Sequence, residues 1–353
     1  MYESFYGLSA KPFQLSPDPE FFFGSRGHRR AMAYLEYGLH QAEGFIVVTG
    51  EVGAGKTTLV RQLLRRLPVD KVVPVQVVTT QLEAAELLRI VADGLGLETA
   101  LADKAALLLL IEARLKELDV EGRRALLIVD EAQNLSPSSI EELRMLSNFQ
   151  LDSRSLLQTF LIGQPELRDL MQRPEMSQLK QRIIAGYHLG PIDAAETRQY
   201  IEHRLSRVGW QQDPVFEDDA FTRIHEVTAG IPRRINTLAD RLLLGAYLAE
   251  KHTIEAGDVS EIADELAAEL GPRAADAIDP RLLRHGAAAG GINGHDTRWA
   301  HDAPLSPDAQ DRLSRLEDRV EVLESSSALI YNTLKKVLRR FRGMSAPAPR
   351  DRQ

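Results

Sequence analysis

The feature that most constrains the fold is a glycine-rich turn between a run of apolar residues and an amphipathic helix. The segment reads GFIVVTGEVGAGKTTLVRQL over residues 44–63, and its turn matches the pattern G-x-x-x-x-G-K-[ST]. The glycines of such a turn let successive backbone N–H groups converge on phosphate oxygens, and the amino end of the helix adds a partial positive charge. We therefore predict that this turn binds a nucleoside triphosphate.

Two side chains of the turn carry the expected chemistry. We expect the Lys56 ammonium to reach the β- and γ-phosphates and the Thr57 hydroxyl to sit on Mg²⁺, so ATP and Mg²⁺ are the expected cofactors. The candidate nucleotide ligands are Gly50, Glu51, Val52, Gly53, Ala54, Gly55, Lys56, Thr57, Thr58 and, further along the chain, Arg233.

A second signal, ALLIVDEAQNL at residues 125–135, bears on hydrolysis. Its apolar run predicts a buried strand, and two carboxylates follow that strand directly. We expect Asp130 to hold the Mg²⁺ shell and Glu131 to orient and polarise the attacking water. The alternative is an acidic pair that merely caps a helix. The position of the pair downstream of the phosphate loop, with one strand between, favours the catalytic interpretation.

Three more polar residues are candidates, and each has a structural alternative. Gln164, after the next strand-like segment, is expected to contact the γ-phosphate or the water, unless it only ends the strand in a turn. Arg182 is the candidate arginine finger for a neighbouring subunit's phosphate, ahead of Arg173. Arg233, in GIPRRIN, either folds over the nucleotide or lies on the surface of an ordinary helix start. The candidate catalytic residues are thus Glu131, Lys56, Gln164 and Arg182.

The order of the remaining segments predicts an α/β fold. Strand-like segments at 45–48, 72–78, 125–129, 157–162 and 186–189 alternate with helix-like segments at 56–67, 83–95, 102–118 and 137–150. This alternation is typical of a parallel sheet sandwiched by helices, as in P-loop NTPases. Residues 193–270 show helical patterns and no strand, which predicts a small all-helical lid domain.

The chain is therefore expected to have five parts. They are an aromatic-rich segment packing on the ATPase core (1–43), a nucleotide-binding domain (44–190), the helical lid (191–270), a flexible linker rich in Gly, Ala, Asp and Pro (271–310), and an amphipathic basic helix (311–342). Apolar residues of the last part recur at three- and four-residue spacing from Leu313 to Phe341, which favours a short coiled coil. Packing on the chain's own globular part and contact with an anionic membrane surface are the alternatives.

Composition narrows the function further. The 353 residues include no cysteine, which excludes a disulfide framework, a thiolate zinc site and a cysteine nucleophile. Residues 1–270 carry 29 Lys and Arg against 40 Asp and Glu, a net charge of −11, whereas residues 311–353 carry 10 against 6, a net charge of +4. The acidic main part weighs against nucleic-acid binding.

Since we find no secretory leader and no membrane-spanning apolar run, we expect a cytoplasmic protein.

Together these residues resemble the AAA+ class of P-loop ATPases. Within that class the chain is similar to the general secretion pathway protein A group, and most like the secretion ATPase of exosortase (PEP-CTERM) loci. The resemblance rests on MYESFYGLSAKPFQLSPDPEFFFGSRGHRRAMAYLEYGL at 1–39, GFIVVTGEVGAGKTTL at 44–59, LLIVDEAQNL at 126–135, LIGQPEL at 161–167 and GIPRRINTLADR at 230–241. It implies that Gln164 is sensor 1 and that Arg233 lies on the sensor 2 helix.

The resemblance also implies a function. It implies ATP hydrolysis by a homo-oligomer in the cytoplasm, linked to the machinery that exports exopolysaccharide or to the associated protein-sorting system. The basic carboxy-terminal helix adds the alternative of a position peripheral to the inner membrane. The alternative is an ATP-dependent DNA-binding regulator of the transposition target-selection type, with Arg233, Arg234 and the basic tail as contacts. Residues 1–43 leave two interpretations open: a clamp near the adenine edge lined by Tyr34 or His28, or a helix packing on the sheet.

Overall fold

A computed structural model describes residues 1–16, 18–41, 43–78, 82–99, 102–152 and 154–270. The linker and the coiled coil that we predict over residues 271–342 lie outside the described residues. In the part of the chain that is described, no helix is both long and apolar enough to cross a bilayer.

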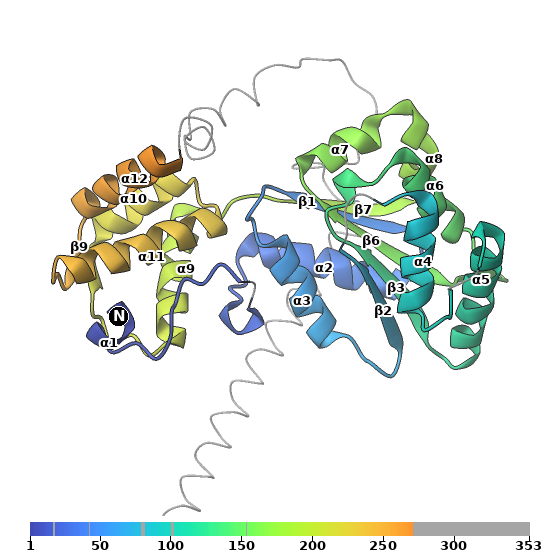
Figure 1. The fold of residues 1–353 in the computed structure, drawn as a ribbon, viewed down its shortest axis with the longest axis horizontal. Coiled ribbons are helices and arrows are strands. Elements are labelled where there is room, and N and C mark those ends of the chain that lie inside the picture. Colours follow the sequence, from blue (N-terminus) through green and yellow to red (C-terminus); the bar gives the residue numbers. More distant parts are fainter. Residues whose placement is uncertain (17, 42, 79–81, 100–101, 153, 271–353) are drawn as a thin grey trace, which may run out of the picture. The chain divides into compact units, whose positions relative to one another are not determined.

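The centre of the nucleotide-binding part is a five-stranded parallel sheet (Figure 1). Its strands are β1 (Phe45–Gly50), β2 (Val72–Val77), β3 (Arg124–Val129), β6 (Leu157–Gly163) and β7 (Ile183–Leu189), in the order β2-β3-β6-β1-β7. All five segments were predicted as strands, and β7 begins three residues earlier than expected. Because the strands are parallel, their carboxyl ends share one edge, where β1, β3 and β6 deliver the predicted functional residues.

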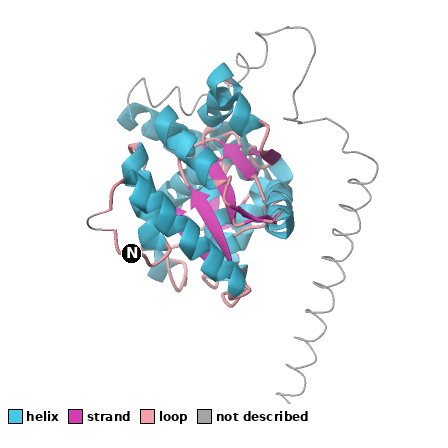
Figure 2. Cartoon of the chain, turned by 90° about the vertical axis from the view of Figure 1, so that its right-hand side faces the viewer, coloured by secondary structure: helices cyan, strands magenta, loops and turns pink. Residues whose placement is uncertain are grey.

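Helices cover both faces of this sheet, as Figure 2 shows. One face carries α2 (Arg26–Gln41) and α3 (Lys56–Arg66). The other elements that contact the sheet are α4 (Ala84–Gly94), α5 (Lys104–Val120) and α7 (Pro165–Gln172), with α6 (Pro137–Leu146) packed on α4. The predicted α/β P-loop architecture is confirmed.

The three central strands, β3, β6 and β1, are buried on both faces, which explains why they read as continuous apolar runs. All six residues of β1 are buried. On the α2 and α3 side, Ile46 and Val48 pack with Leu35, Leu59 and neighbouring apolar residues. This packing fixes α2 and α3 against β1, and the turn that joins β1 to α3 is the predicted phosphate loop.

Several short elements also lie among residues 1–190. They are α1 (Tyr2–Phe5), η1 (Pro19–Phe21), η2 (Ala132–Asn134), η3 (Pro174–Met176), α8 (Ser177–Lys180) and the hairpin of β4 (Gln150–Leu151) with β5 (Arg154–Ser155).

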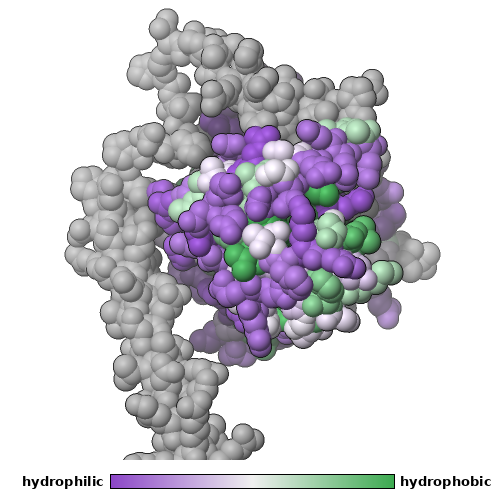
Figure 3. Space-filling model, turned by 90° about the vertical axis from the view of Figure 1, so that its left-hand side faces the viewer, coloured by the Kyte–Doolittle hydropathy of each residue, from purple (hydrophilic) through white to green (hydrophobic). Residues whose placement is uncertain are grey.

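The second part is built from four helices: α9 (Ala194–Arg207), α10 (Asp218–Thr228), α11 (Pro232–Leu248) and α12 (Ala256–Leu270). Contrary to the all-helical expectation, β8 (Val215–Phe216) and β9 (Thr253–Ile254) pair in parallel between them. Two residues are too few for strand periodicity to be visible in a sequence. The face shown in Figure 3 is mainly hydrophilic, with smaller apolar areas between.

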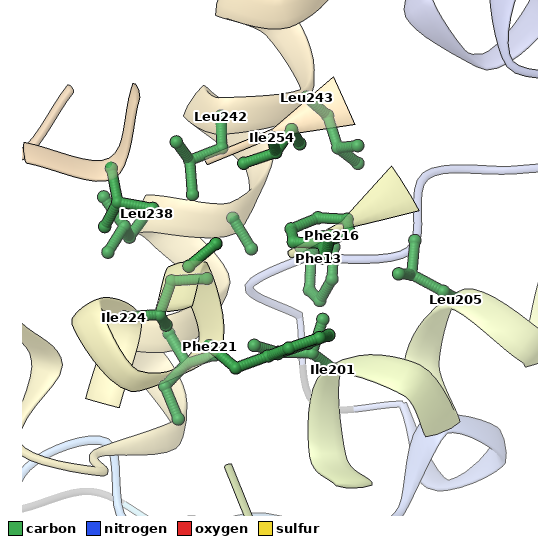
Figure 4. Packing of buried hydrophobic residues seen from close by; sticks show 14 of the residues in the cluster. Phe13, Ile201, Leu205, Phe216, Phe221, Ile224, Leu238, Leu242, Leu243 and Ile254 are labelled. Atoms are coloured by element: carbon green, nitrogen blue, oxygen red, sulfur yellow. The ribbon is translucent and has the colours of Figure 1, made fainter. Parts of the chain in front are cut away.

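The amino-terminal residues divide between the two parts. We expected the whole of residues 1–43 to pack on the ATPase core, and α2 does so. Tyr2, Tyr6, Leu8 and Phe13 instead belong to the apolar cluster of the helical part, where Phe13 is only 2% exposed and shares the cluster with Phe216 (Figure 4). Burying large aromatic side chains between helices stabilises the fold more than leaving them exposed on the surface of the ATPase core.

Candidate nucleotide site

The phosphate loop has the backbone that its glycines allow. Gly53 and Gly55 have φ of 85° and 97°, in the left-handed region that favours glycine. A Cβ on Gly50 would lie 2.5 Å from the carbonyl oxygen of Leu189. Helix α3 begins at Lys56, directly after Gly55, so its unpaired N–H groups face the loop. The result is a concave, N–H-lined turn at a helix terminus, which suits an anion.

Lys56 lies folded into this turn. Its side chain is 6% exposed, and Nζ donates to the carbonyl oxygens of Gly50 at 2.6 Å and Glu51 at 3.0 Å. Burial lowers the Lys56 pKa, and the carboxylates of Glu131 and Asp130 oppose that shift. The ammonium therefore stands between the backbone of the loop and two acidic groups, as a phosphate-binding lysine should.

Thr57 and Asp130 form the pair that we predicted would hold Mg²⁺. The Thr57 hydroxyl donates to Oδ2 of Asp130 at 3.1 Å, although the two residues are far apart in sequence. Burial raises the Asp130 pKa overall, although hydrogen bonds from the Glu131 N–H and from Thr57 oppose the rise. A hydroxyl and a carboxylate, both hard oxygen ligands, thus converge beside the phosphate loop, and this donor set fits Mg²⁺.

Glu131 occupies a strained backbone position. Its φ is 52°, and it precedes the short helix η2. One oxygen of its carboxylate, Oε2, accepts from Nε2 of Gln133 at 2.6 Å and from Nε2 of Gln164 at 2.9 Å. Burial raises the Glu131 pKa, but these two donors and the Lys56 charge outweigh it and lower the pKa overall. Glu131 is therefore an ionised carboxylate at neutral pH.

Gln133 joins the site, although it was not among the predicted site residues. Its Oε1 accepts from the backbone N–H of Gln164 at 3.0 Å, so Gln133 bridges two residues that we did predict. The only available signal was its position two residues after Glu131 in DEAQ. The link to Gln164 depends on β3 lying beside β6, a pairing that the sequence does not specify.

Arg233 lies on the phosphate loop. Its backbone N–H, at the start of α11, donates to the carbonyl oxygen of Gly53 at 3.2 Å, and a Cβ on Gly53 would lie 2.4 Å from that of Arg233. Its neighbour Arg234 is half-buried; burial lowers the Arg234 pKa, and the charge of Glu51 opposes the shift. The first turn of α11 therefore lies against the phosphate loop, with the aliphatic stem of Arg233 on Gly53 and the Arg234 charge within reach of Glu51.

Arg182 lies at the other end of the sheet. Its carbonyl accepts from the N–H of Phe45, the first residue of β1, at 2.9 Å. Its guanidinium donates to the hydroxyl of Ser147 at 2.8 Å and to Oδ1 of Asn148. Since the phosphate loop follows the last residue of β1, Arg182 does not join the site of its own chain.

The two aromatic candidates of the amino-terminal segment have separate surroundings. His28 is 5% exposed, its Nδ1 lies 2.7 Å from the Ser25 hydroxyl, and its Nε2 would lie 2.6 Å from a Cβ on Gly55. Tyr34 stacks on Tyr187 with ring centroids 5.5 Å apart. His28 thus packs directly against the phosphate loop.

Of the other predicted ligands, Ala54 is 1% exposed and Val52 is 53% exposed, while Thr58 is half-buried in α3. Only their backbone is expected to matter for phosphate binding.

Known proteins resemble this chain in sequence and in fold. A family model described as an AAA domain matches residues 39–171. General secretion pathway protein A of Aeromonas hydrophila is 40% identical over 270 residues, which make up 75% of this chain and 48% of that protein. The chain therefore spans about half the length of this curated relative.

Solved structures share the fold. The ORC2 protein of Aeropyrum pernix matches with a TM-score of 0.55 and 19% identity, over 73% of this chain and 72% of that one. Cdc6p of Pyrobaculum aerophilum matches with a TM-score of 0.57 and 15% identity, over 72% and 70%. At these identities the likeness concerns the fold alone.

Proposed function

Because this chain is an AAA+ P-loop protein related to general secretion pathway protein A, we propose that it binds Mg²⁺-ATP at the phosphate loop and hydrolyses it. The observation that carries the proposal is the convergence of Lys56, Thr57, Asp130 and Glu131 at one edge of the sheet. Bound Mg²⁺ would neutralise charge on the phosphates. The chain's own residues hold it and position the reacting groups.

Each residue has a defined part in this proposal. Lys56 exchanges its bonds to backbone carbonyls for bonds to the β- and γ-phosphates, while Thr57 and Asp130 hold the metal. Glu131, kept ionised by its two amide donors, accepts a proton from the attacking water. Gln164 contacts the γ-phosphate, and Arg233 closes over the nucleotide from α11.

We further propose that the protein works as a homo-oligomer. Arg182 is hydrogen-bonded at the end of the sheet remote from its own phosphate loop, which leaves a neighbouring subunit's site as the place where it would act as an arginine finger. The oligomer would serve an envelope export system, that of exopolysaccharide and exosortase-associated secretion, from the cytoplasmic side of the inner membrane.

A DNA-binding regulator is the less favoured function. Two of its supposed contacts, Arg233 and Arg234, lie beside the phosphate loop and Glu51, where bound nucleotide would occupy them. The net charge of residues 1–270 is −11. A salt-sensitive, ATP-dependent shift of duplex DNA would support this function, and no shift at low salt would exclude it.

Substitution of Glu131 tests the catalytic assignment. Glu131→Gln keeps the shape of the side chain but removes the proton acceptor, so we expect it to bind ATP and to hydrolyse it at least about a hundredfold more slowly than wild type. Filter retention of labelled ATP and phosphate release measure the two properties. Wild-type turnover by Glu131→Gln would refute the assignment.

A further inference from the structure

We propose that Gln133 is the fixed anchor of the catalytic carboxylate, and that it holds Glu131 in place while the Gln164 side chain moves to the γ-phosphate. The proposal rests on the proposed ATP hydrolysis and assigns a positioning role to a residue that neither the motifs nor the comparisons single out.

The observation is a closed ring of hydrogen bonds. Gln133 donates from Nε2 to Oε2 of Glu131 at 2.6 Å, and its Oε1 accepts from the backbone N–H of Gln164 at 3.0 Å. The Gln164 side chain closes the ring by donating to the same Oε2 at 2.9 Å. Gly163 makes room for the ring, because a Cβ there would lie 2.8 Å from Oε1 of Gln133. Both ends of the Gln133 amide are therefore engaged.

The two donors to Glu131 differ in how they are held. Gln164 reaches Glu131 by its side chain alone, so a rotamer change can redirect it to the γ-phosphate. Gln133 is held by the main chain of Gln164, which is fixed between β6 and α7. When the Gln164 side chain leaves, its backbone N–H stays, and Gln133 keeps its orientation.

The arrangement also selects which carboxylate oxygen reacts. Both amides donate to Oε2, which reduces the basicity of that oxygen. Oε1 of Glu131 is then the oxygen that faces the water. Loss of the Gln133 donor would let the carboxylate rotate away from this orientation.

The test replaces Gln133 by methionine, which has similar length and cannot donate. We expect Gln133→Met to bind a fluorescent ATP analogue as tightly as wild type and to keep the wild-type KM for ATP, but to lose about tenfold or more in kcat. Asn134→Met is the matched control, because Asn134 is the exposed neighbour of Gln133 in the same turn. An unchanged kcat in Gln133→Met, or an equal loss of kcat in Asn134→Met, would overturn the proposal.

A second measurement needs no nucleotide. In a double-mutant cycle of thermal unfolding with Glu131→Ala, Gln133→Met should cost less in Tm when Glu131 is already absent. Additive losses would overturn the anchor. The two proposals can fail separately. If the two substitutions are coupled in Tm but the wild-type protein releases no phosphate, the proposed hydrolysis is refuted and the Gln133–Glu131 contact is still supported.

Discussion

At the residue scale, the site combines a half-buried catalytic carboxylate with more deeply buried side chains around it. Glu131 and Gln164 are half-buried, whereas Lys56, Asp130 and His28 are almost enclosed. Burial disfavours the charged form of an ionisable group, whereas nearby opposite charges and hydrogen bonds stabilise that form. Burial lowers the pKa of His28 to about 4, and a hydrogen bond with the Ala54 backbone opposes that shift.

This shift predicts a dependence of stability on pH. Because the folded-state pKa of His28 lies below its ordinary value of 6.5, the unfolded chain takes up the proton first, and stability falls as pH drops from about 6.5 toward 4. Between pH 7 and pH 5 the loss from His28 amounts to about 2 kcal/mol. Urea unfolding of wild type and His28→Asn at both pH values measures it. Other histidines contribute equally to both proteins, so equal pH dependence in the two would contradict the prediction.

At the element scale, the contact between α11 and the phosphate loop shapes the nucleotide site. The amino end of α11 contacts the loop at Gly53, where the left-handed backbone and the nearby Arg233 leave no space for a Cβ.

Gly53→Ala should therefore weaken ATP binding about tenfold or more, since the left-handed conformation alone costs an alanine about 1–2 kcal/mol. Gly257→Ala is the matched control, because nothing lies within 4 Å of the added methyl group. Titration with a fluorescent ATP analogue measures both, and equal affinities would be contrary evidence.

The amino-terminal segment makes a second contact of this kind, with the helical part. Phe13 is 2% exposed within the helical cluster, and the Arg204 guanidinium donates to the carbonyl oxygens of Pro12 and Gln14 beside it. We expect Phe13→Ala to lower the free energy of unfolding by about 3–5 kcal/mol. Leu15→Ala, in the same segment but 57% exposed, should change it by less than about 0.5 kcal/mol. Denaturant unfolding of both variants checks the difference, and similar losses would speak against the packing described.

How much the sequence predicts depends on how local each signal is. The five strands of the central sheet, four of the helices around it, the phosphate loop and the acidic pair follow from patterns within a few residues, and the structure has them within a few residues of the predicted positions. The Gln133 bridge requires β3 beside β6, and the place of Phe13 requires knowledge of a helical cluster that closes around it. Such contacts join residues distant in the chain, so no local pattern reports them.

At the scale of the whole molecule, the remaining question is whether one chain is enough. Arg182 is engaged with Ser147 and Asn148, away from its own phosphate loop. We predict that Arg182→Ala binds ATP normally but hydrolyses it at least about a hundredfold more slowly. Mixed with inactive Glu131→Gln, it should regain part of the activity, since mixed oligomers contain sites with an intact Glu131 and a neighbouring intact Arg182. If the mixture stays inactive while both variants co-assemble, Arg182 does not act in trans.

ATP hydrolysis by an oligomer is tested by phosphate release from the purified wild-type chain, measured against protein concentration with Mg²⁺ and ATP. We predict hydrolysis whose specific activity rises with concentration and then levels off, and which Glu131→Gln abolishes. Absence of phosphate release at every concentration, from protein that binds ATP, would contradict it.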